Sequence, residues 1–364
     1  MFLEPQLFRY MMYLDVFYKG TDKSNTVGTL VVTDFSKAFD CIDHTLAIQR
    51  LYELGTRCEI LPWIANFLTA RRQRVQYQSA LSEWKTLSCG VPQGTKLGPI
   101  TFIAVINNAS ENSATKSFKY VDDLSLGEVR QANQQSRIGQ DVQDLDAWAK
   151  DNHLTLNPSK CKVMQVCFKK EPPAPPSFQI AGIELEVVSE TKLLGLTVQS
   201  NLGWQTHINN IVTKASRRLY MLSRLRRFGV PAEDLVSVYM GYVRPACENA
   251  APVWHGSITA SQTNQLERIQ KRACRIILGS GYDSYTETLH QLELQTLEDR
   301  RLHLCQQFAH KCLESQRYST WFPTNPKIHS MRLRHTKSFH VPRCNTNRYR
   351  DSAIPFLTDI VNHS

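Results

Sequence analysis

An apolar run that ends in an acid is the feature that most constrains this fold. The segment GTLVVTDF (28–35) predicts a buried strand with Asp34 at its end. A second segment, SFKYVDDLSLGEV (117–129), predicts two short strands around a tight turn that holds Asp122 and Asp123. Carboxylates at strand ends can converge, so we expect these three side chains to meet.

Carboxylates gathered at one point repel one another unless divalent cations lie between them. Hard oxygen ligands select Mg²⁺ or Mn²⁺. A pair of such ions suits phosphoryl transfer, since one lowers the pKa of an attacking hydroxyl and the other stabilises the departing pyrophosphate. Taken singly, each aspartate is better explained as a solvated turn residue, so the prediction depends on their combination.

A proline-rich stretch, KKEPPAPPSF (169–178), divides the chain and predicts an extended linker or exposed loop. Ahead of it we expect helices at 44–55 and 59–70, followed by a hairpin at 71–88. An apolar segment at 100–109 and a long amphipathic helix at 131–152 should come next. Beyond it, helices should predominate from about 205 to 315. The tail after Trp321 is polar and predicts loose order.

The net charge of the chain is concentrated in one half. Lysine and arginine number 43 against 33 acids, which gives +10. Up to residue 200 there are 21 basic and 21 acidic residues, whereas the remainder has 22 and 12. A basic half joined to a neutral half is typical of a polyanion-binding module beside a part with another task. The alternative is a basic surface that serves solubility alone.

No membrane or secretion signal is expected. Apolar runs fall short of the roughly 20 residues that cross a bilayer. The opening segment, MFLEPQLFRYMMYLDVF, carries Glu4, Arg9 and Asp15, so it fits neither a signal peptide nor an anchor. The ten cysteines are scattered, with no CxxC pair, as suits a reducing compartment. We therefore expect an intracellular protein, in the nucleus or the cytoplasm, with free thiols and no membrane partner.

Four segments of the chain carry motifs in a fixed order: TDFSKAFDCIDH (33–44), SCGVPQGTKLGPITFIAVINN (88–108), KYVDDLSL (119–126) and LDAWAKDNHLTLNPSKCKVM (145–164). Together they closely resemble the palm motifs of reverse transcriptases from non-LTR (LINE-type, jockey-like) retrotransposons. The resemblance continues through 191–225, which is similar to the family's primer grip and thumb, and through 266–301, which is similar to the region that follows the thumb.

The resemblance implies an α+β polymerase palm, an antiparallel sheet with helices on one face, followed by a helical thumb and a helical C-terminal extension. We expect a palm with a remnant of fingers at 1–170 and a proline-rich linker with a primer-grip-like hairpin at 171–200. A basic thumb at 201–260, the extension at 261–320 and a polar tail at 321–364 should follow. Only 33 residues precede Asp34, so we expect an N-terminally truncated element whose fingers are largely missing.

The same resemblance assigns catalytic roles. Asp34 and Asp122 match the metal-binding aspartates, and Asp123 matches the third acid of the Y-x-D-D turn. Lys160, in LNPSK, matches a lysine that protonates the leaving pyrophosphate. The alternative for Lys160 is an ordinary surface lysine, because other basic residues lie nearby.

Nucleotide contacts are implied for Phe35, Phe39, Gln93 and Gly94. Phe39 matches the steric gate, an aromatic ring under the incoming sugar that clashes with a ribose 2′-OH; without the motif it would be an ordinary core phenylalanine. Gln93 matches a residue beside the templating base, where the flanking glycines let the backbone approach closely. Lys96 departs from the family, which has an aliphatic residue there.

The segment around 205–227 predicts an amphipathic helix with two different faces. Its apolar face is expected to comprise Ile208, Ile211, Val212, Ala215, Leu219 and Leu222. Basic residues lie largely away from that face, with no acid between His207 and Val230. They could contact the phosphates of a primer–template duplex without reading sequence, or simply be solvated; they are Lys214, Arg217, Arg218, Arg224 and Arg227.

The implied function is RNA-directed DNA polymerisation by two-metal phosphoryl transfer. Its partners would be an RNA or DNA template with a primer, deoxynucleoside triphosphates and two Mg²⁺ ions, with Mn²⁺ possible in their place. A competing hypothesis is a catalytically inert, truncated remnant of a retroelement that still binds nucleic acid. A weaker one is a protein in which the palm serves only as a scaffold.

Overall fold

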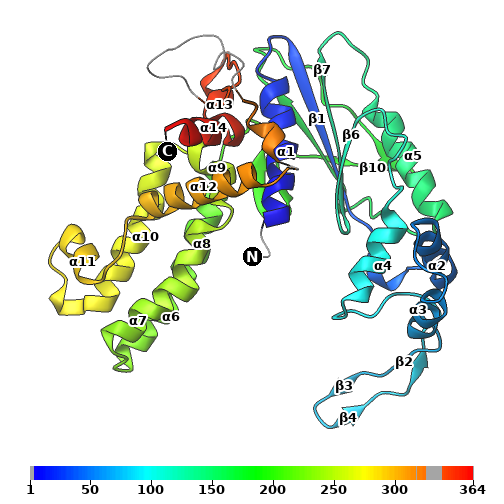
Figure 1. Ribbon diagram of the computed structural model, residues 1–364, viewed down its shortest axis with the longest axis horizontal. Helices are drawn as coiled ribbons and strands as arrows, with labels where there is room; N and C mark the ends of the chain where they lie inside the picture. The colour runs from blue at the N-terminus through cyan, green and yellow to red at the C-terminus, as the bar shows by residue number, and fades with distance from the viewer. Residues whose placement is uncertain (1–3, 317, 325–337, 364) are drawn as a thin grey trace. The chain divides into compact units, whose positions relative to one another are not determined.

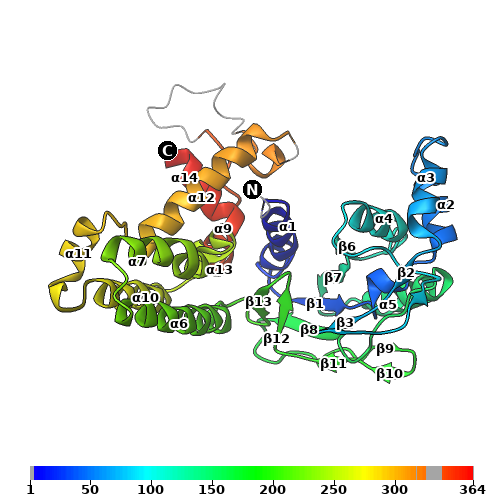
Figure 2. The ribbon, with the colours of Figure 1, turned by 90° about the horizontal axis from the view of Figure 1, so that it is seen from below.

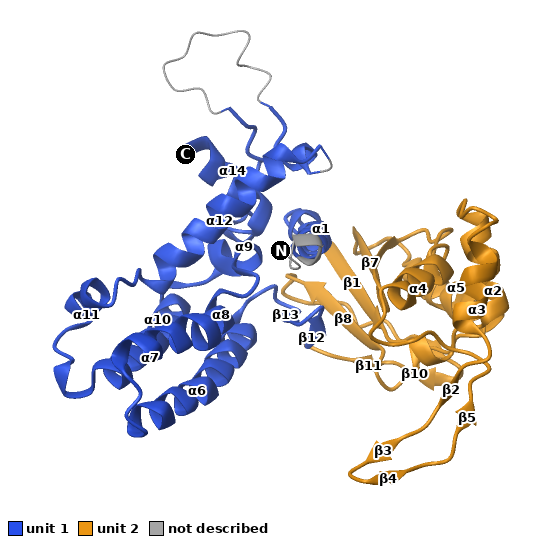
Figure 3. Ribbon diagram, turned by 60° about the horizontal axis from the view of Figure 1, so that its bottom comes forward, with its two compact units in different colours: residues 1–24, 190–364 blue, residues 25–189 orange. Residues whose placement is uncertain are grey.

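The computed structural model describes residues 4–316, 318–324 and 338–363. The chain forms two compact units, shown in Figure 3. We call residues 25–189 the sheet unit, and residues 1–24 with 190–364 the helical unit. The fold is mixed helix and sheet, with an antiparallel-rich sheet and C-terminal helices, as the sequence predicted.

A five-stranded sheet in the order β11-β8-β1-β7-β6 is the centre of the sheet unit (Figure 1). Its strands are β1 (Thr26–Thr33), β6 (Lys116–Tyr120), β7 (Asp123–Gln131), β8 (Lys162–Cys167) and β11 (Glu186–Val187). The central strand β1 pairs antiparallel with β7 and β8, and β11 pairs parallel with β8. Val27, Leu30 and Val31 are almost completely buried, because the apolar run has sheet neighbours on both sides.

The helices of this unit all pack into one core against one face of the sheet. They are α2 (His44–Glu53), α3 (Leu61–Leu68), α4 (Leu97–Ile106) and α5 (Ile138–Asp151). From the sheet, the core takes Val31, Leu124, Leu126 and Val163. Val31 lies directly opposite both Leu126 and Val163, so these side chains point to the same face.

Two expectations for this unit can be compared with the structure directly. The hairpin predicted at 71–88 is confirmed by β2 (Arg72–Gln73) with β5 (Lys85–Thr86), and by β3 (Gln76–Tyr77) with β4 (Ala80–Leu81). The prediction of a helix over 131–152 is wrong about where the helix begins. Strand β7 stays paired with β1 as far as Gln131, so α5 begins only at Ile138. The short strands β9 (Gln179–Ile180) and β10 (Ile183–Glu184) follow the proline-rich stretch.

The helical unit is built mainly from helices that follow the hairpin of β12 (Glu190–Leu193) and β13 (Leu196–Gln199). Helices α6 (Gln205–Arg227) and α10 (Ala260–Leu278) lie side by side (Figure 2). Thr259 begins α10 with a capping box, since its hydroxyl accepts from the Gln262 N–H and the Gln262 side chain accepts from the Thr259 N–H. The other α-helices are α1 (Glu4–Gly20), α7 (Ala232–Val238), α8 (Arg244–Glu248), α9 (Ala251–Trp254), α11 (Tyr285–Gln291), α12 (Leu297–Glu314), α13 (Asn347–Arg350) and α14 (Ala353–His363).

Two parts of the expected division differ from the structure. Residues 1–24 were expected in the palm but group with the helical unit, because Tyr18 donates to the Leu202 carbonyl at 2.8 Å and Asp22 accepts from the Asn345 and Thr346 N–H groups at 2.8 and 2.9 Å. Residues 171–189, expected in the linker segment, belong to the sheet unit through β11.

The expectation of a loosely ordered tail over 321–364 is wrong for residues 338–363. Helix α14 buries Ile354, Leu357 and Thr358, and its packing against α12 explains the order. Part of the expected tail, 325–337 and residue 364, lies outside the described residues. Within the described ranges, no helix is both long enough and apolar enough to cross a membrane.

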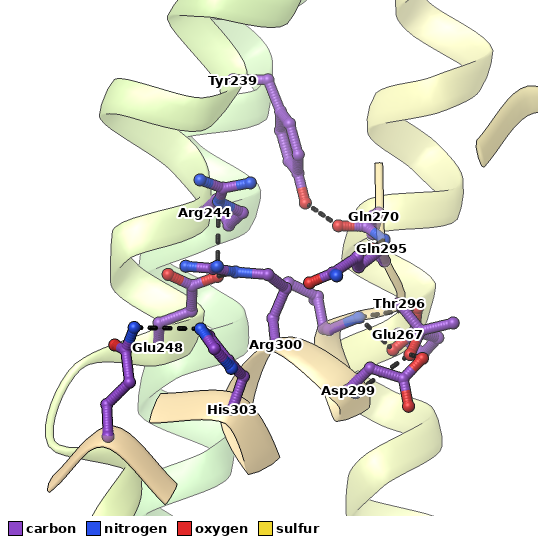
Figure 4. A network of polar contacts seen from close by, with 12 residues as sticks. Tyr239, Arg244, Glu248, Glu267, Gln270, Gln295, Thr296, Asp299, Arg300 and His303 are labelled. Carbon is purple, nitrogen blue, oxygen red and sulfur yellow. Dashed lines mark hydrogen bonds and ion pairs between the residues drawn. The ribbon is translucent and has the colours of Figure 1, made fainter. Parts of the chain in front are cut away.

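A buried polar network links the helices of the helical unit (Figure 4). At its centre Gln270 is fully buried, accepts from the Tyr239 hydroxyl at 2.6 Å and donates to the Gln295 carbonyl at 2.8 Å. One turn earlier, Glu267 accepts from the N–H of Leu297, the first residue of α12, at 3.2 Å. Because these groups have partners, the packing of α10 on α12 satisfies polar atoms that would otherwise be buried at a cost.

Tyr239→Phe should destabilise the chain, because it leaves the buried amide oxygen of Gln270 without this donor. We expect the free energy of unfolding in urea to fall by about 1–3 kcal/mol. Tyr220→Phe is the matched control, since Tyr220 is 64% exposed and should tolerate the same change. Equal unfolding curves for the two variants would contradict the importance of the network.

Candidate active site

The pairing of β1 with β7 brings the two acidic segments together. Thr33, the last residue of β1, lies opposite Leu124, and its hydroxyl donates to the Leu124 carbonyl at 2.8 Å. Asp34 follows Thr33, and Asp123 precedes Leu124, so these two acids come from adjacent strands at the same level. Tyr120 pairs with Asp123 and closes the β6–β7 turn, which contains Asp122.

Asp123 feels the negative charges of the other two acids. Partial burial, and then the charges of Asp122 and Asp34, raise the pKa of Asp123 above its ordinary value. Such repulsion is what a divalent cation relieves, and the donor set is entirely oxygen, so the residues fit Mg²⁺ or Mn²⁺. No group of three potential ligand side chains is already arranged as a metal site in the part of the chain that the structure describes.

The turn that carries Asp122 is strained. Val121 has a φ of 54°, in the left-handed region that a β-branched residue rarely adopts. Its side chain packs against the hydrophobic core beneath the sheet, which offsets part of the cost. A strained residue held by core packing fixes the direction of the acid that follows it, as is common at functional sites.

Lys160 lies beside Asp34 because its turn is attached to the backbone of that residue. The N–H of Asn157 donates to the Asp34 carbonyl at 2.8 Å, and the N–H of Cys161 closes the turn on the Asn157 carbonyl at 3.0 Å. The Lys160 Nζ is 3.3 Å from the Asp34 Oδ2. This ion pair places a cation beside the acidic cluster.

The two phenylalanines differ in exposure. Phe35 is only 6% exposed and packs edge-on to the ring of Trp148, so its side chain belongs to the core. Phe35 therefore has no aromatic surface to offer a nucleotide. Phe39 is half-buried and stacks on Phe102, with ring centroids 4.7 Å apart. The stacking holds the Phe39 ring in one orientation.

The loop before α4 is clamped against the turn at Asp40. Gly90 has a φ of 86° and donates its N–H to the Ile42 carbonyl at 2.8 Å. Gln93 is exposed and donates its side-chain N–H to the Asp40 Oδ1 at 3.3 Å. Gly94 also has a positive φ, 79°, but nothing crowds it. The loop thus presents Gln93 and Gly94 to solvent on a fixed base.

A cleft of about 670 Å³ opens beside this loop. Its charged lining residues are Lys37, Asp40 and Arg71. None of these three was singled out from the sequence. Lys37 and Asp40 could have been found because they lie within the motif TDFSKAFDCIDH that contains Asp34. Arg71 has no such sequence signal, because only the folding of the hairpin brings it to the cleft.

The Gly90 and Gly94 pair provides a test of the clamp. A Cβ at Gly90 would lie 2.8 Å from the Asp40 carbonyl oxygen, whereas Gly94 has open space, and both have positive φ. Gly90→Ala should therefore accelerate hydrogen exchange at the Val91 amide, which donates to the Phe39 carbonyl at 2.8 Å. Gly94→Ala should leave that amide protected. Equal protection in both variants would show that the close contact does not hold the loop.

The basic residues predicted on the helix at 205–227 divide into two groups on α6. Lys214, Arg217, Arg224 and Arg227 are exposed. Arg218 is partly buried, stacks over the ring of Tyr242 with its guanidinium 4.7 Å from the centroid, and donates to the Tyr242 carbonyl. The opposite face is buried as predicted, through Ile208, Ile211, Ala215, Leu219 and Leu222.

Similar proteins are known for most of the chain. "Probable RNA-directed DNA polymerase from transposon X-element" of Drosophila melanogaster is 23% identical over 280 residues, which cover 73% of this chain and 30% of that protein. "RNA-directed DNA polymerase from mobile element jockey" of the same organism is 22% identical and covers 80% of this chain and 32% of its own length. The chain thus spans about a third of the length of these curated relatives.

A solved telomerase structure from Candida albicans covers 81% of this chain and 53% of its own, at 12% identity and a TM-score of 0.36. The family assignment comes from the sequence. A model of the family described as "Reverse transcriptase (RNA-dependent DNA polymerase)" matches residues 5–198, which is more than half of the chain. The chain belongs to the reverse transcriptase family.

Proposed function

We propose that the chain is an RNA-directed DNA polymerase of a non-LTR retrotransposon, which extends a primer 3′-OH with deoxynucleoside triphosphates. The observation that carries this proposal is the register of β1 and β7, which sets Asp34 beside Asp123 and the turn of Asp122. The ion pair between Lys160 and Asp34 supports it further, because it adds a cation at the same place. Such a protein would act inside the cell, where its nucleotide substrates are.

Asp34, Asp122 and Asp123 would hold the divalent cations. When bound, these ions would lower the pKa of the primer hydroxyl and stabilise negative charge on the transferred phosphate. The ammonium of Lys160 would give its proton to the departing pyrophosphate. The Asn157 turn, which is attached to the Asp34 backbone, would keep that donor near the reacting phosphates.

The half-buried Phe39 would select the sugar. Its ring is held by Phe102, so it would resist displacement by a ribose 2′-OH. Gln93 would contact the incoming nucleotide or its template partner from the exposed loop, and Gly94 leaves room for that approach. For Phe35 the buried ring restricts any nucleotide contact to its backbone.

The helical unit would bind the primer–template duplex. Residues 201–260 would serve as the thumb and residues 261–320 as its helical extension. Lys214, Arg217, Arg224 and Arg227 are exposed on α6 and can each reach a phosphate. Arg218 would contribute less, because Tyr242 already engages its guanidinium.

A primer-extension assay tests the catalytic proposal. The purified chain should extend a labelled DNA primer on an RNA template with deoxynucleotides and Mg²⁺. Asp34→Asn and Asp122→Asn should each lower the rate by about a thousandfold or more, because each removes a charged metal ligand. Asp151→Asn, an exposed aspartate at the end of α5, is the matched control and should retain activity.

The outcomes of this assay separate the two main hypotheses. If the chain extends the primer and both active-site variants abolish that extension, the polymerase hypothesis is supported. A folded chain that binds nucleic acid but extends no primer would favour the inert remnant instead. Extension that survives in Asp34→Asn and Asp122→Asn would refute the assignment of these acids.

Salt dependence tests the thumb. Each phosphate contact to duplex DNA contributes a slope of about −0.9 in log K against log salt. Replacing Lys214, Arg217 and Arg224 with Gln should therefore flatten the slope for duplex binding by roughly 2 to 3. The control with the same change in charge replaces the exposed Arg57, Lys169 and Lys170 of the sheet unit. An equal flattening in both would indicate a diffuse charge effect and contradict a binding face on α6.

A further inference from the structure

The hairpin of residues 71–87 extends from the sheet unit as a separate arm (Figure 1). Every residue from 72 to 86 is exposed, so the arm contributes nothing to the core that would explain its length. It nevertheless carries large side chains in solvent: Val75 is 69% exposed, Tyr77 74%, Leu81 50% and Trp84 51%. Neither the family roles nor the proposed catalytic residues include this arm.

Positive charge is also gathered on the arm. Residues 71–87 contain four basic side chains and a single acid, Glu83. The basic residues are Arg71, Arg72, Arg74 and Lys85. An apolar docking surface for a protein or a membrane would not by itself require this excess. Together with exposed aromatic rings, the charge is complementary to a nucleic acid strand, whose phosphates are anionic and whose unpaired bases can stack.

The arginines are already oriented for phosphate. Arg72 and Arg74 lie two residues apart, so their side chains share one face of the hairpin. Their guanidinium carbons lie 5.5 and 4.6 Å from the ring centroid of Trp84 on the opposite strand. A guanidinium held over an indole ring has lost some rotamer freedom already and can still donate N–H groups to a phosphate.

A bulge in the hairpin sets this stack. Gln73 pairs with Lys85, whereas Gln76 pairs with Leu81, so the returning strand has one extra residue between the two ladders. The bulge adjoins Trp84.

The base of the arm opens onto the cleft beside the candidate active site. Arg71 and Gln73 line that cleft together with Lys37 and Gln93. A strand that follows the arm toward the sheet would therefore meet two more cations before it reaches the Gln93 loop.

We propose that the arm binds an unpaired strand of nucleic acid, with Arg72 and Arg74 on its phosphates and with Trp84 and Tyr77 against its bases. Single-stranded rather than duplex nucleic acid is the ligand, because the bases of a duplex are already stacked and cannot lie on exposed rings. The inference rests on the proposed function in that a template strand is the nucleic acid expected here.

Binding of a labelled oligouridylate to the full chain, without nucleotides or metal, tests the proposal. Trp84→Ala should weaken binding about tenfold or more, and Tyr77→Ala should weaken it in the same direction. Trp84→Phe should restore most of the loss, because the ring is kept. Trp63→Ala is the matched control, since Trp63 is 65% exposed on α3. A blunt duplex should bind all these variants equally.

Charge provides a second, independent readout. Replacing Arg72 and Arg74 with Gln should flatten the salt dependence of oligouridylate binding by about 1.4, since each contact with a single strand contributes about 0.7. Asp122→Asn should bind as tightly as the unmodified chain. If the chain extends no primer but the arm variants weaken oligouridylate binding as expected, the arm proposal stands although the polymerase proposal fails. If the chain extends a primer but the arm variants bind oligouridylate normally, only the arm proposal is overturned.

Two results would overturn the proposal directly. One is oligouridylate binding that Trp84→Ala and Tyr77→Ala leave unchanged. The other is a chain that sediments as a dimer and becomes a monomer in Trp84→Ala without any change in oligouridylate binding, which would make the arm a surface for self-association.

Discussion

The pairing of β1 with a strand on each side is the constraint on which the rest of the sheet unit depends. Val31 faces Leu126 on one neighbour and Val163 on the other, and all three point into the core. A slip of one residue would turn this set to the opposite face and would also separate Asp34 from Asp123. The apolar side chains that stabilise the sheet therefore also fix the spacing of the acids.

Local patterns allowed prediction of the elements that they alone determine. The run before Asp34 and the Asp122–Asp123 turn have clear strand and turn signals, and both were found where expected. The role of Phe35 could not be judged in this way. Phe35 continues the extended chain by pairing with Leu156, so its side chain points opposite to that of Asp34 and enters the core. A motif gives residue order but not the direction of each side chain.

Long-range partners account for the other differences. Strand β7 runs past the predicted 117–129 segment because Gln131 pairs with Thr26 of β1, and α5 therefore begins only at Ile138. Similarly, the order of the last residues depends on Asp22, which lies 323 positions away from Asn345. Neither interaction leaves a mark in the local sequence, because each segment supplies only half of it.

Arginines held on aromatic rings recur in both units. Arg72 and Arg74 lie over Trp84, and Arg218 lies over Tyr242. In each case the ring restricts the rotamers of a long side chain before any ligand arrives, so less conformational entropy remains to be lost on binding. Arg218 differs from the two arginines of the arm because it also donates a hydrogen bond to the Tyr242 carbonyl. Its guanidinium is therefore tied to the fold of the helical unit.

The division of the chain into units has a consequence for its synthesis. The sheet unit is one continuous stretch, 25–189, and can fold while the ribosome is still translating the remainder. The helical unit is discontinuous, and Asp22, two residues after α1, meets its partners only when residues 345 and 346 emerge. Met11, Leu14 and Phe17 of α1 are buried in the finished protein, and partners of this helix such as Leu202 and α14 emerge only after the sheet unit. Helix α1 is therefore made before the sheet unit but secured only after it, so a chaperone would be needed at α1 more than in the continuous unit.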